Sequence, residues 1–413
     1  MLSSTVIHHR HLRLHTLPQY LLPRLPLHPV LYSVSASLMA ETSDSRVSPL
    51  DGAAPESTDF ANYFCTYAYL YHQKEMLEDH KRTGAYFQAV MSNRRQFLNK
   101  VVLDVGTGSG ILSIFAAKAG AKKVYAVEAT DMAQHARKLV AHNKLENVIE
   151  VIQGTIETID LPEKVDIIIS EWMGYFLLRE SMLDSVLVAR DKFLKPGGAL
   201  YPSHANMFMV PIRSHASGQR VQDLQGSMEA WAGFLQDMQH FYQVDLDVLG
   251  PSFHQEQNEY YLHTSQWTDT HPQQMLGSPT CFKRFDLHKL TLEELKAPMK
   301  VSFDMHVADG GPVEALCGYF DVLFKGSEEN PADNDVKLST APDAQGATHW
   351  GQQVFFVQPP IACEVEDVLH TSLLLTRKPE NHRLLRVQMQ VQVRGPSGAP
   401  REPQARQLYY NIE

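Results

Sequence analysis

The stretch Val102-Leu103-Asp104-Val105-Gly106-Thr107-Gly108-Ser109-Gly110 decides the fold class of this chain. It predicts a buried strand, a tight glycine turn and then a helix, since Ile111 and Leu112 follow directly. Glu128 lies eighteen residues beyond Gly110, at the end of a second hydrophobic run. In a β–α–β unit this arrangement places the carboxylate near a ribose and the helix N-terminus near the ligand. The stretch therefore predicts a site for a nucleoside-containing cofactor.

The spacing of these glycines bears on which cofactor binds. A dinucleotide-binding turn needs a further glycine where this chain has Ile111, because helix and strand pack closely there around a pyrophosphate. The Gly-x-Gly-x-Gly pattern favours S-adenosyl-L-methionine, which has a ribose and an adenine but no phosphate. A nicotinamide oxidoreductase is disfavoured by Ile111 and by the lack of a hydride-site histidine or tyrosine motif. A glycine turn that binds no ligand is the remaining structural alternative.

Strands and helices alternate from residue 99 to residue 200, which predicts a parallel sheet covered on both faces. Two helices are expected ahead of this region, over residues 59–98. The expected strands are Val101–Val105, Val124–Glu128, Val148–Ile152 and Val165–Ser170. The expected helices that connect them are Leu112–Ala119, Met132–His142 and Ser181–Phe193.

The pattern changes after Tyr201-Pro202 to short alternating segments separated by turn residues. Such segments predict an antiparallel sheet or barrel, and they are Asn206–Ile212, Met299–Val307, Gly318–Phe324, Gln352–Val357 and Leu384–Val393. Apolar residues instead recur every three or four positions over Met228–Tyr242. This spacing predicts an amphipathic helix inserted into the β region.

The chain of 413 residues has a formal net charge of −10, and the charge is unevenly distributed. Residues 1–40 contain three arginines and no acidic residue, so the remainder carries 34 of the 37 basic residues against all 47 acidic ones. An acidic remainder favours cationic partners and disfavours direct nucleic-acid binding, although ordinary solubility explains it equally. The four cysteines are far apart, which indicates free thiols in a reducing compartment and no metal site. No apolar run is long enough to predict a membrane span.

Residues 1–56 are expected to form an unfolded or targeting extension, because they are rich in His, Leu, Pro and Ser. Two explanations of residues 1–38 stay open. Arginines without acids, together with several serines, resemble an organelle transit peptide. Alternatively, translation starts at Met39 and these residues come from an over-extended gene model, which the helix-breaking prolines favour. The expected location is the nucleus and cytoplasm, and an organelle only if the transit peptide is genuine.

After the fourth expected strand comes Ser170-Glu171-Trp172-Met173-Gly174-Tyr175-Phe176-Leu177-Leu178-Arg179-Glu180-Ser181-Met182. The carboxyl ends of parallel strands line the ligand crevice of such sheets. Glu171 and Glu180 are nine residues apart, and they can converge there if the chain folds back at Gly174. The alternatives are solvent exposure for either acid, or a position near the N-terminus of the next helix for Glu180.

Together these motifs resemble the protein arginine N-methyltransferase family, from about Tyr63 to the C-terminus. The resemblance rests on the glycine turn, Glu128, the Ser170–Met182 segment and several shorter matches. The shorter matches are Tyr63-Phe64, His72, Met76-Leu77, Arg82, Glu157 and Thr348-His349-Trp350. The opening run over residues 63–74 is most similar to the plant branch numbered ten of this family.

The resemblance implies an α/β fold with a Rossmann-like methyltransferase domain of the seven-stranded type over residues 57–201. An antiparallel β-barrel is expected over residues 202–413, with a cis peptide at Tyr201-Pro202. A helical dimerisation arm is expected over residues 213–262, inserted in the barrel and packed against the partner's cofactor domain in a head-to-tail homodimer. The alternative is that the aromatic side chains of Met228–Tyr242 fill the barrel's own core.

The resemblance also implies the reaction, which transfers a methyl group from S-adenosyl-L-methionine to a guanidinium nitrogen of a protein arginine. This nitrogen is a poor nucleophile because the guanidinium charge is delocalised and always present. Glu171 and Glu180 are expected to hold the guanidinium by charge-assisted hydrogen bonds and to draw positive charge away from the attacking nitrogen. On the cofactor, Arg82 is expected to meet the carboxylate, Glu128 the ribose and Glu157 the adenine amine. The expected cofactor site is completed by His72, Asp104, Gly106 and Gly108.

Further residues are assigned by the same resemblance. His349 is expected to pair with Asp79, either as a proton relay or as a structural clamp. Met76, Met182 and Tyr67 are expected to line the target arginine. A methionine at position 76 favours asymmetric dimethylarginine, the product of a type I enzyme.

These expectations describe an active homodimeric enzyme that modifies Arg/Gly-rich or histone tails and regulates chromatin. The competing hypothesis is a catalytically inactive module of the same fold that holds arginine tails in its cleft. The presence of Arg82, Glu128, Glu171, Glu180 and His349 argues against that hypothesis.

Overall fold

The computed structural model describes residues 64–413, so the expectations for residues 1–56 lie outside the described residues. Two helices are expected ahead of the first sheet, and the structure has α2 (Leu70–Glu78), α3 (His80–Met91) and α4 (Arg94–Phe97) there, besides helical residues at 64–67. Asp79 separates α2 from α3, because its backbone is extended and its carboxylate accepts the Arg82 N–H as an N-cap. The element boundary therefore lies at a residue that the resemblance places in the active site.

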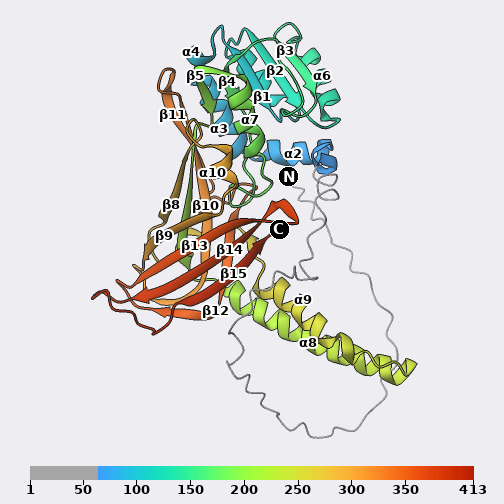
Figure 1. The fold of residues 1–413 in the computed structure, drawn as a ribbon, viewed down its shortest axis with the longest axis vertical. Coiled ribbons are helices and arrows are strands. Elements are labelled where there is room, and N and C mark those ends of the chain that lie inside the picture. The colour runs from blue at the N-terminus through green and yellow to red at the C-terminus, as the bar shows by residue number, and fades with distance from the viewer. Residues whose placement is uncertain (1–63) are drawn as a thin grey trace, which may run out of the picture. The chain divides into compact units, whose positions relative to one another are not determined.

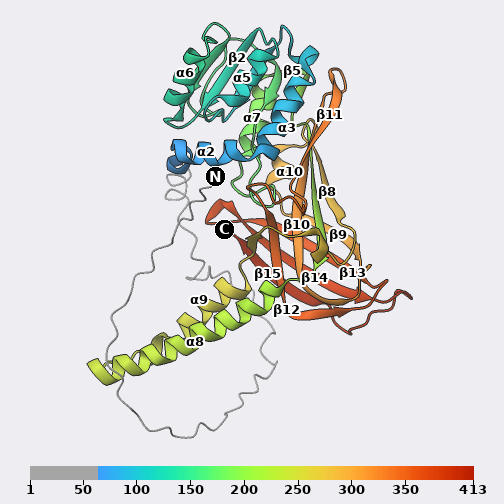
Figure 2. The ribbon, with the colours of Figure 1, turned by 180° about the vertical axis from the view of Figure 1, so that it is seen from behind.

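Five parallel strands form the first sheet, in the order β3-β2-β1-β4-β5. The strands are β1 (Val101–Val105), β2 (Lys123–Glu128), β3 (Ile149–Gln153), β4 (Val165–Ile169) and β5 (Leu194–Tyr201). The helices between them are α5 (Ile111–Lys118), α6 (Met132–His142) and α7 (Leu183–Phe193), shown in Figures 1 and 2. The chain order reverses between β1 and β4, which is where ligands bind to such sheets. The predicted α/β fold is confirmed, and each expected boundary in this region is within two residues of the observed one.

The number of strands differs from the expected seven-stranded type, since the parallel sheet has five among the described residues. The chain leaves this sheet after β5 through a cis peptide at Tyr201-Pro202, as expected. The next strand, β6 (His204–Ile212), pairs antiparallel with β10 (Gly311–Gly326). The residues after β5 therefore build the antiparallel part of the fold and do not extend the parallel sheet.

Two antiparallel sheets form the barrel-like domain. One has the order β7-β12-β10-β6-β8 with β11 paired to β10, and the other has the order β15-β14-β13-β9. The bounds are β7 (Gln266–Thr268), β8 (Thr280–Asp286), β9 (Met299–His306), β11 (Pro331–Ser339), β12 (Gln352–Cys363), β13 (Val368–Lys378), β14 (Asn381–Arg394) and β15 (Arg406–Ile412). Aromatic rings join the two sheets, since the ring centroids of Phe282 and Phe303 are 5.0 Å apart and those of Phe355 and Tyr410 are 5.2 Å apart. A short helix, α10 (Leu292–Lys296), precedes β9.

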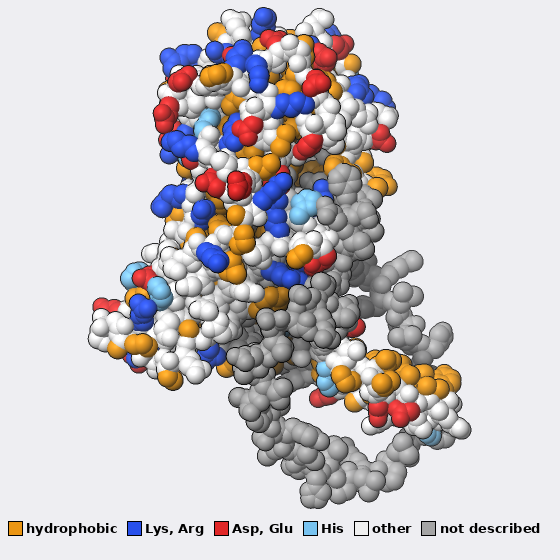
Figure 3. Space-filling view, in the orientation of Figure 1, with side chains coloured by type: hydrophobic (Ala, Val, Ile, Leu, Met, Phe, Trp, Pro, Cys, Tyr) orange, Lys and Arg blue, Asp and Glu red, His pale blue; other side chains and the backbone are white. Residues whose placement is uncertain are grey.

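A helical hairpin leaves the barrel between β6 and β7 (Figure 1). It consists of α8 (His215–Tyr242) and α9 (Gly250–Leu262), with the 3-10 turn Asp247–Leu249 between them. In these two fully described helices Ser217 is the only buried residue, so the hypothesis that their aromatic side chains fill the barrel core is wrong. Apolar side chains instead lie along the surface of the hairpin (Figure 3), and Phe241 and Tyr242 are 67% and 69% exposed.

Hydrogen bonds fasten the barrel to the parallel-sheet domain. The Asn93 amide exchanges two hydrogen bonds with the backbone of Asn334, at 2.9 and 2.8 Å. The Gln96 amide donates to the Pro331 carbonyl at 2.8 Å. These contacts hold β11 against α3 and α4, so the two parts can build one site between them. None of the helices over residues 64–413 has the length and apolar character needed to cross a membrane.

Candidate active site

A cavity of about 430 Å³ lies at the carboxyl ends of β1, β2 and β4. Ten of the fourteen residues that the sequence analysis assigns to the site line it: Tyr67, Met76, Arg82, Gly106, Gly108, Glu128, Glu157, Glu171, Glu180 and Met182. The other four, His72, Asp79, Asp104 and His349, are not part of its lining. Segments far apart in the sequence are thus brought together around one space.

The glycine turn forms one wall of the cavity, and its backbone conformation favours glycine. Gly106 and Gly108 have φ values of 68° and 56°, in the left-handed region that side chains disfavour. A Cβ atom on Gly106 would also lie 2.3 Å from the Met182 methyl group. The buried Glu128 carboxylate accepts the Gly108 N–H at 2.9 Å and both the N–H and the hydroxyl of Thr130. These bonds fix an anionic group beside the turn.

Asp104 lies beneath the turn and is fully buried. Its Oδ2 atom accepts the hydroxyls of Thr107 and Ser113 at 2.6 and 2.7 Å, whereas Oδ1 has no hydrogen-bond partner among the described residues. Burial raises the pKa of Asp104 to about 6, although the two hydroxyls and the Ser113 N–H lower it. In this structure Asp104 supports the turn from below and does not reach the cavity.

The segment after β4 folds back sharply and carries both predicted glutamates. The Gly174 N–H donates to the Leu177 carbonyl at 3.0 Å, and a Cβ atom on Gly174 would lie 1.8 Å from the Arg179 carbonyl oxygen. Four residues that are not glycine have positive φ here, namely Phe176, Leu177, Glu180 and Ser181. Each such residue costs on the order of 1–3 kcal/mol, so surrounding contacts must enforce this conformation. We call residues 171–181 the double-glutamate loop.

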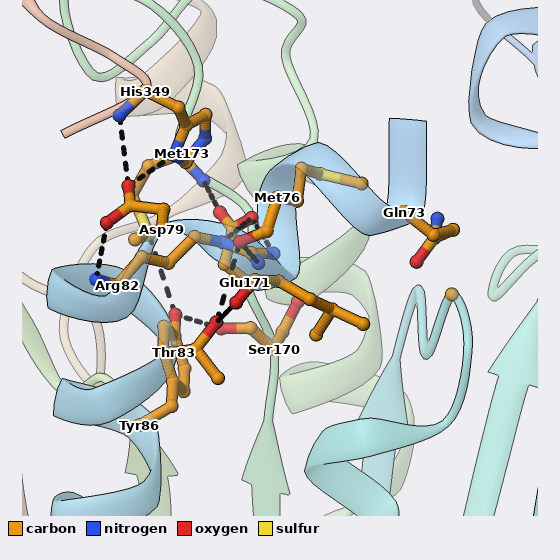
Figure 4. Close-up of polar contacts among 12 residues, drawn as sticks. Gln73, Met76, Asp79, Arg82, Thr83, Tyr86, Ser170, Glu171, Met173 and His349 are labelled. Atoms are coloured by element: carbon orange, nitrogen blue, oxygen red, sulfur yellow. Dashed lines mark hydrogen bonds and ion pairs between the residues drawn. The ribbon is translucent and has the colours of Figure 1, made fainter. Parts of the chain in front are cut away.

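Glu171 is held by Arg82 from α3 (Figure 4). Glu171 Oε2 accepts from Arg82 Nε at 3.0 Å and Nη2 at 2.6 Å, while Arg82 Nη1 donates to the Met76 carbonyl. The Met173 N–H donates to the other carboxylate oxygen at 3.1 Å. Both side chains of the pair are mostly buried, with 12% and 13% exposed. Charge-assisted bonds of this kind are strong and directional, so Glu171 has a defined orientation in the cavity wall.

Glu180 is held by residues from two other parts of the chain. The Tyr67 hydroxyl donates to Glu180 Oε2 at 2.9 Å, and Arg179 Nη1 lies 3.5 Å from Oε1. The Glu180 N–H donates to the carbonyl of Arg383, in β14 of the barrel, at 2.9 Å. Glu171 and Glu180 therefore line one cavity, as their sequence positions predict.

His349 and Asp79 form the expected pair behind Arg82 (Figure 4). Asp79 Oδ2 lies 2.7 Å from His349 Nδ1 and accepts the His349 N–H at 2.9 Å, while Asp79 Oδ1 accepts the Arg82 N–H at 3.0 Å. Burial raises the pKa of Asp79, but the hydrogen bonds from the His349 ring and from the backbone N–H groups of Arg82 and His349 outweigh it and bring the pKa to about 2. The pair therefore ties the loop before β12 to the start of α3.

Sequence reasoning missed Gln73, which lines the cavity in place of its neighbour His72. Gln73 is buried, and its Oε1 atom accepts the Ser109 N–H of the glycine turn at 3.2 Å. His72 is rotated away by about 100° on the same helix, and its ring lies beside Tyr71 and Glu75. A histidine in a motif suggests a functional role, whereas a mid-helix glutamine gives no signal of its own. Over residues 64–413, no three His, Cys, Asp or Glu side chains are grouped as metal ligands.

The cavity also has a wall from the barrel, which the sequence analysis did not assign. Leu292 and Lys296 of α10 and His382 and Arg383 of β14 line it. Glu157, assigned to the adenine amine, accepts the Ser185 hydroxyl at 2.7 Å and lines the same cavity. The cavity is thus built from both domains.

Comparison with known proteins agrees with this geometry. The model of the arginine methyltransferase oligomerization subdomain matches residues 204–396, and that of ribosomal protein L11 methyltransferase matches residues 79–203. Protein arginine N-methyltransferase PRMT10 of Arabidopsis thaliana is 49% identical over 350 residues, which cover 84% of this chain and 91% of that protein. The chain belongs to the protein arginine N-methyltransferase family.

Solved structures of this family show the same fold. The crystal structure of Arabidopsis thaliana protein arginine methyltransferase 10, described as a uniquely open conformation, has a TM-score of 0.82 and covers 85% of this chain and all of that one. A Trypanosoma brucei PRMT1 enzyme–prozyme heterotetrameric complex with AdoHcy is 31% identical, with a TM-score of 0.69 and coverage of 84% of this chain and all of that one. As a protein arginine N-methyltransferase, the chain uses S-adenosyl-L-methionine as methyl donor.

Proposed function

We propose that this chain is a type I protein arginine N-methyltransferase, which forms mono- and asymmetric dimethylarginine in Arg/Gly-rich or histone tails. The main support is that Glu171 and Glu180 line the same cavity as the glycine turn and Glu128. A planar guanidinium pairs with carboxylates through parallel hydrogen bonds, so two carboxylates beside a methyl donor match an arginine substrate. Met76 and Met182 also line this cavity and are proposed to flank the target arginine.

The residues around the glycine turn fit the cofactor. Gly106 keeps the backbone open to a ligand, and Glu128 Oε2 accepts one hydrogen bond, so it retains capacity for a ribose hydroxyl. Arg82 uses three of its five N–H groups on Glu171 and Met76, which leaves two for a cofactor carboxylate. When bound, S-adenosyl-L-methionine supplies a methyl group on a sulfonium, and the reaction is a displacement in which positioning dominates.

The side chains of the site then have separate roles in this proposal. Glu171, oriented by Arg82, and Glu180, oriented by Tyr67, grip the substrate guanidinium and raise the nucleophilicity of one of its nitrogens. Asp79 and His349 act as a structural clamp, because neither lines the cavity and Asp79 holds the Arg82 N–H. We choose the clamp over the relay because Asp79 and His349 lie next to Arg82 and outside the cavity lining.

The substitution Glu171→Gln tests the role of the paired carboxylates. It keeps the size of the side chain but removes the charge, so we expect turnover of an arginine peptide to fall by about 10²-fold or more. The dissociation constant of S-adenosyl-L-methionine should stay within about threefold of the wild-type value, measured by calorimetry. Glu150→Gln, which removes a surface ion pair with Lys123, is the matched control and should keep full activity. Turnover of the Glu171→Gln enzyme close to wild type would remove the carboxylate mechanism.

We further propose that the chain works as a homodimer through the α8–α9 hairpin. Its exposed aromatic residues and the match of residues 204–396 to the oligomerization subdomain support this.

The nucleus and cytoplasm are the proposed locations, and imaging of a fluorescent fusion that begins at Met39, beside one with the full chain, would test them. Mass spectrometry of methylated peptides tests the product, since symmetric dimethylarginine would contradict the type I assignment.

A further inference from the structure

The turn that joins β13 to β14 reaches the double-glutamate loop from the barrel. His382 and Arg383 follow this turn and line the active-site cavity, about 200 residues after Glu180 in the chain. The structure thus places a barrel hairpin directly against a catalytic loop of the other domain. We call residues 368–394 the β13–β14 hairpin.

Three sets of contacts join this hairpin to the loop and to the helix that follows it. The Glu180 N–H donates to the Arg383 carbonyl at 2.9 Å, and the Ser181 hydroxyl donates to the His382 carbonyl at 2.7 Å. Arg377 donates to both oxygens of Asp184, at 2.7 Å each, in the first turn of α7. Arg377 and Asp184 are mostly buried, with 17% and 18% of their side chains exposed. A bidentate pair of this kind fixes direction as well as distance.

These contacts occur where the backbone needs external support. Glu180 and Ser181 have φ values of 80° and 58°, a conformation that side chains rarely adopt. Consecutive residues in such a conformation persist only when their surroundings enforce it. The Tyr67 and Arg179 contacts hold the Glu180 carboxylate, whereas the hairpin accepts the Glu180 backbone N–H and the Ser181 hydroxyl.

We propose that the β13–β14 hairpin positions Glu180 for the substrate arginine, with Arg377 as its anchor on α7. This inference rests on the proposed function, because it assigns Glu180 to guanidinium binding. Arg377 does not line the cavity, so it is a positioning residue and acts through Asp184 and the loop. The anchor makes no bond to the glycine turn or to Glu128 in the contacts described above, and it reaches Glu157 only through Ser185, the neighbour of Asp184. Cofactor binding should therefore depend on this anchor less than peptide binding does.

The test is the kinetics of Arg377→Gln, with S-adenosyl-L-methionine and an arginine peptide as substrates. Displacement of Glu180 should raise the KM for the peptide on the order of tenfold, because it loosens the grip on the guanidinium. The dissociation constant of S-adenosyl-L-methionine should change by less than about twofold. Arg377→Lys keeps the positive charge but loses the planar guanidinium, so its peptide KM should lie between those of the wild type and of Arg377→Gln.

Arg401→Gln is the matched control on the same barrel, since Arg401 pairs with Asp367 and Glu364 away from the cavity. It should lower the thermal unfolding temperature without raising the peptide KM. Should Arg377→Gln fail to fold, Ser181→Ala tests the same proposal through the His382 contact.

The outcomes separate the two proposals. If the wild-type enzyme is active but Arg377→Gln leaves the peptide KM unchanged, only the positioning role is overturned. The same holds if Arg401→Gln raises the peptide KM as much as Arg377→Gln does. A wild-type protein that does not methylate the peptide overturns the proposed function and this inference with it.

Discussion

Asp104 is a titratable residue in a fully buried position in β1, two residues before Gly106 of the glycine turn. Burial raises the pKa of Asp104 from about 3.8 to about 6, because only one of its oxygens has hydroxyl partners. Above about pH 6 the folded protein therefore contains a buried carboxylate that the unfolded chain would expose to water. This difference destabilises the fold by about 3 kcal/mol relative to pH values below about 3, where both states are protonated.

Asp104→Asn is expected to remove this pH-dependent penalty. The substitution should raise the free energy of unfolding of the ligand-free protein, and this increase should be about 2 kcal/mol larger at pH 7.5 than at pH 4, as measured by urea unfolding. Asp166→Asn is the control, and it should change the free energy of unfolding in the opposite direction. The pKa of Asp166 is lowered overall, because hydrogen bonds from Val101 and Lys195 outweigh its burial. Its loss should cost stability at pH 7.5, and an equal effect of Asp104→Asn at both pH values would contradict the prediction.

At the scale of single elements, the double-glutamate loop shows how much depends on one missing side chain. The loop returns on itself because the Gly174 N–H reaches the Leu177 carbonyl while the Arg179 carbonyl passes close to the Gly174 Cα. Phe176 packs in the turn against Phe355 of the barrel, with 5.3 Å between ring centroids. Both glutamates therefore depend on the backbone of residues that do not line the cavity.

Gly174→Ala is expected to open this loop, because its Cβ atom would lie 1.8 Å from the Arg179 carbonyl oxygen. Methylation of an arginine peptide should fall by at least about tenfold as the glutamates are displaced. Gly218→Ala in α8 is the control, since an added Cβ atom meets nothing within 4 Å there. That change should keep activity and stabilise the helix by about 0.5–1 kcal/mol. Full activity of the Gly174→Ala enzyme would show that the loop tolerates the close approach.

Helices and strands were predictable from the sequence where the apolar periodicity is strong or where glycine or proline residues mark their ends. Strand β1 and helix α6 have the expected bounds because a glycine turn ends the first and apolar spacing marks the second. Helix α8 begins thirteen residues before the expected Met228, since its first half is polar and shows no apolar stripe. Residues in the site were predictable where they belong to a motif. Gln73 was not, because a mid-helix glutamine gives no signal of its own. Lys296 and the β13–β14 hairpin were not, because only the packing of the two domains brings them to the cavity.

At the scale of the whole molecule, the α8–α9 hairpin presents apolar surface that the rest of the described chain does not cover. Phe234, Phe241 and Tyr242 are exposed on α8, and Val248 is 82% exposed in the 3-10 turn Asp247–Leu249. Inside the hairpin, Trp231 stacks on Phe253 with 4.1 Å between ring centroids, so the two helices support each other. Exposed aromatic residues on a supported element are typical of a protein interface.

The double substitution Phe241→Ser and Tyr242→Ser is expected to weaken the proposed homodimer. Loss of two aromatic anchors should raise the dimer dissociation constant by at least about 30-fold, measured by sedimentation equilibrium. Val365→Ser removes an exposed apolar residue of the barrel that is 56% exposed, and it should leave the association unchanged. A dimer of undiminished affinity in the double variant would place the interface elsewhere.

The contact between Ser181 and His382 also bears on the order in which parts of the site form during synthesis. A ribosome adds about 5–20 residues per second, so the 201 positions between them take on the order of ten to forty seconds to synthesise. Throughout that interval the nascent parallel-sheet domain already contains both glutamates but lacks the strand that supports one of them. The chain therefore completes the support of its double-glutamate loop late in its own synthesis, long after the glycine turn has been made.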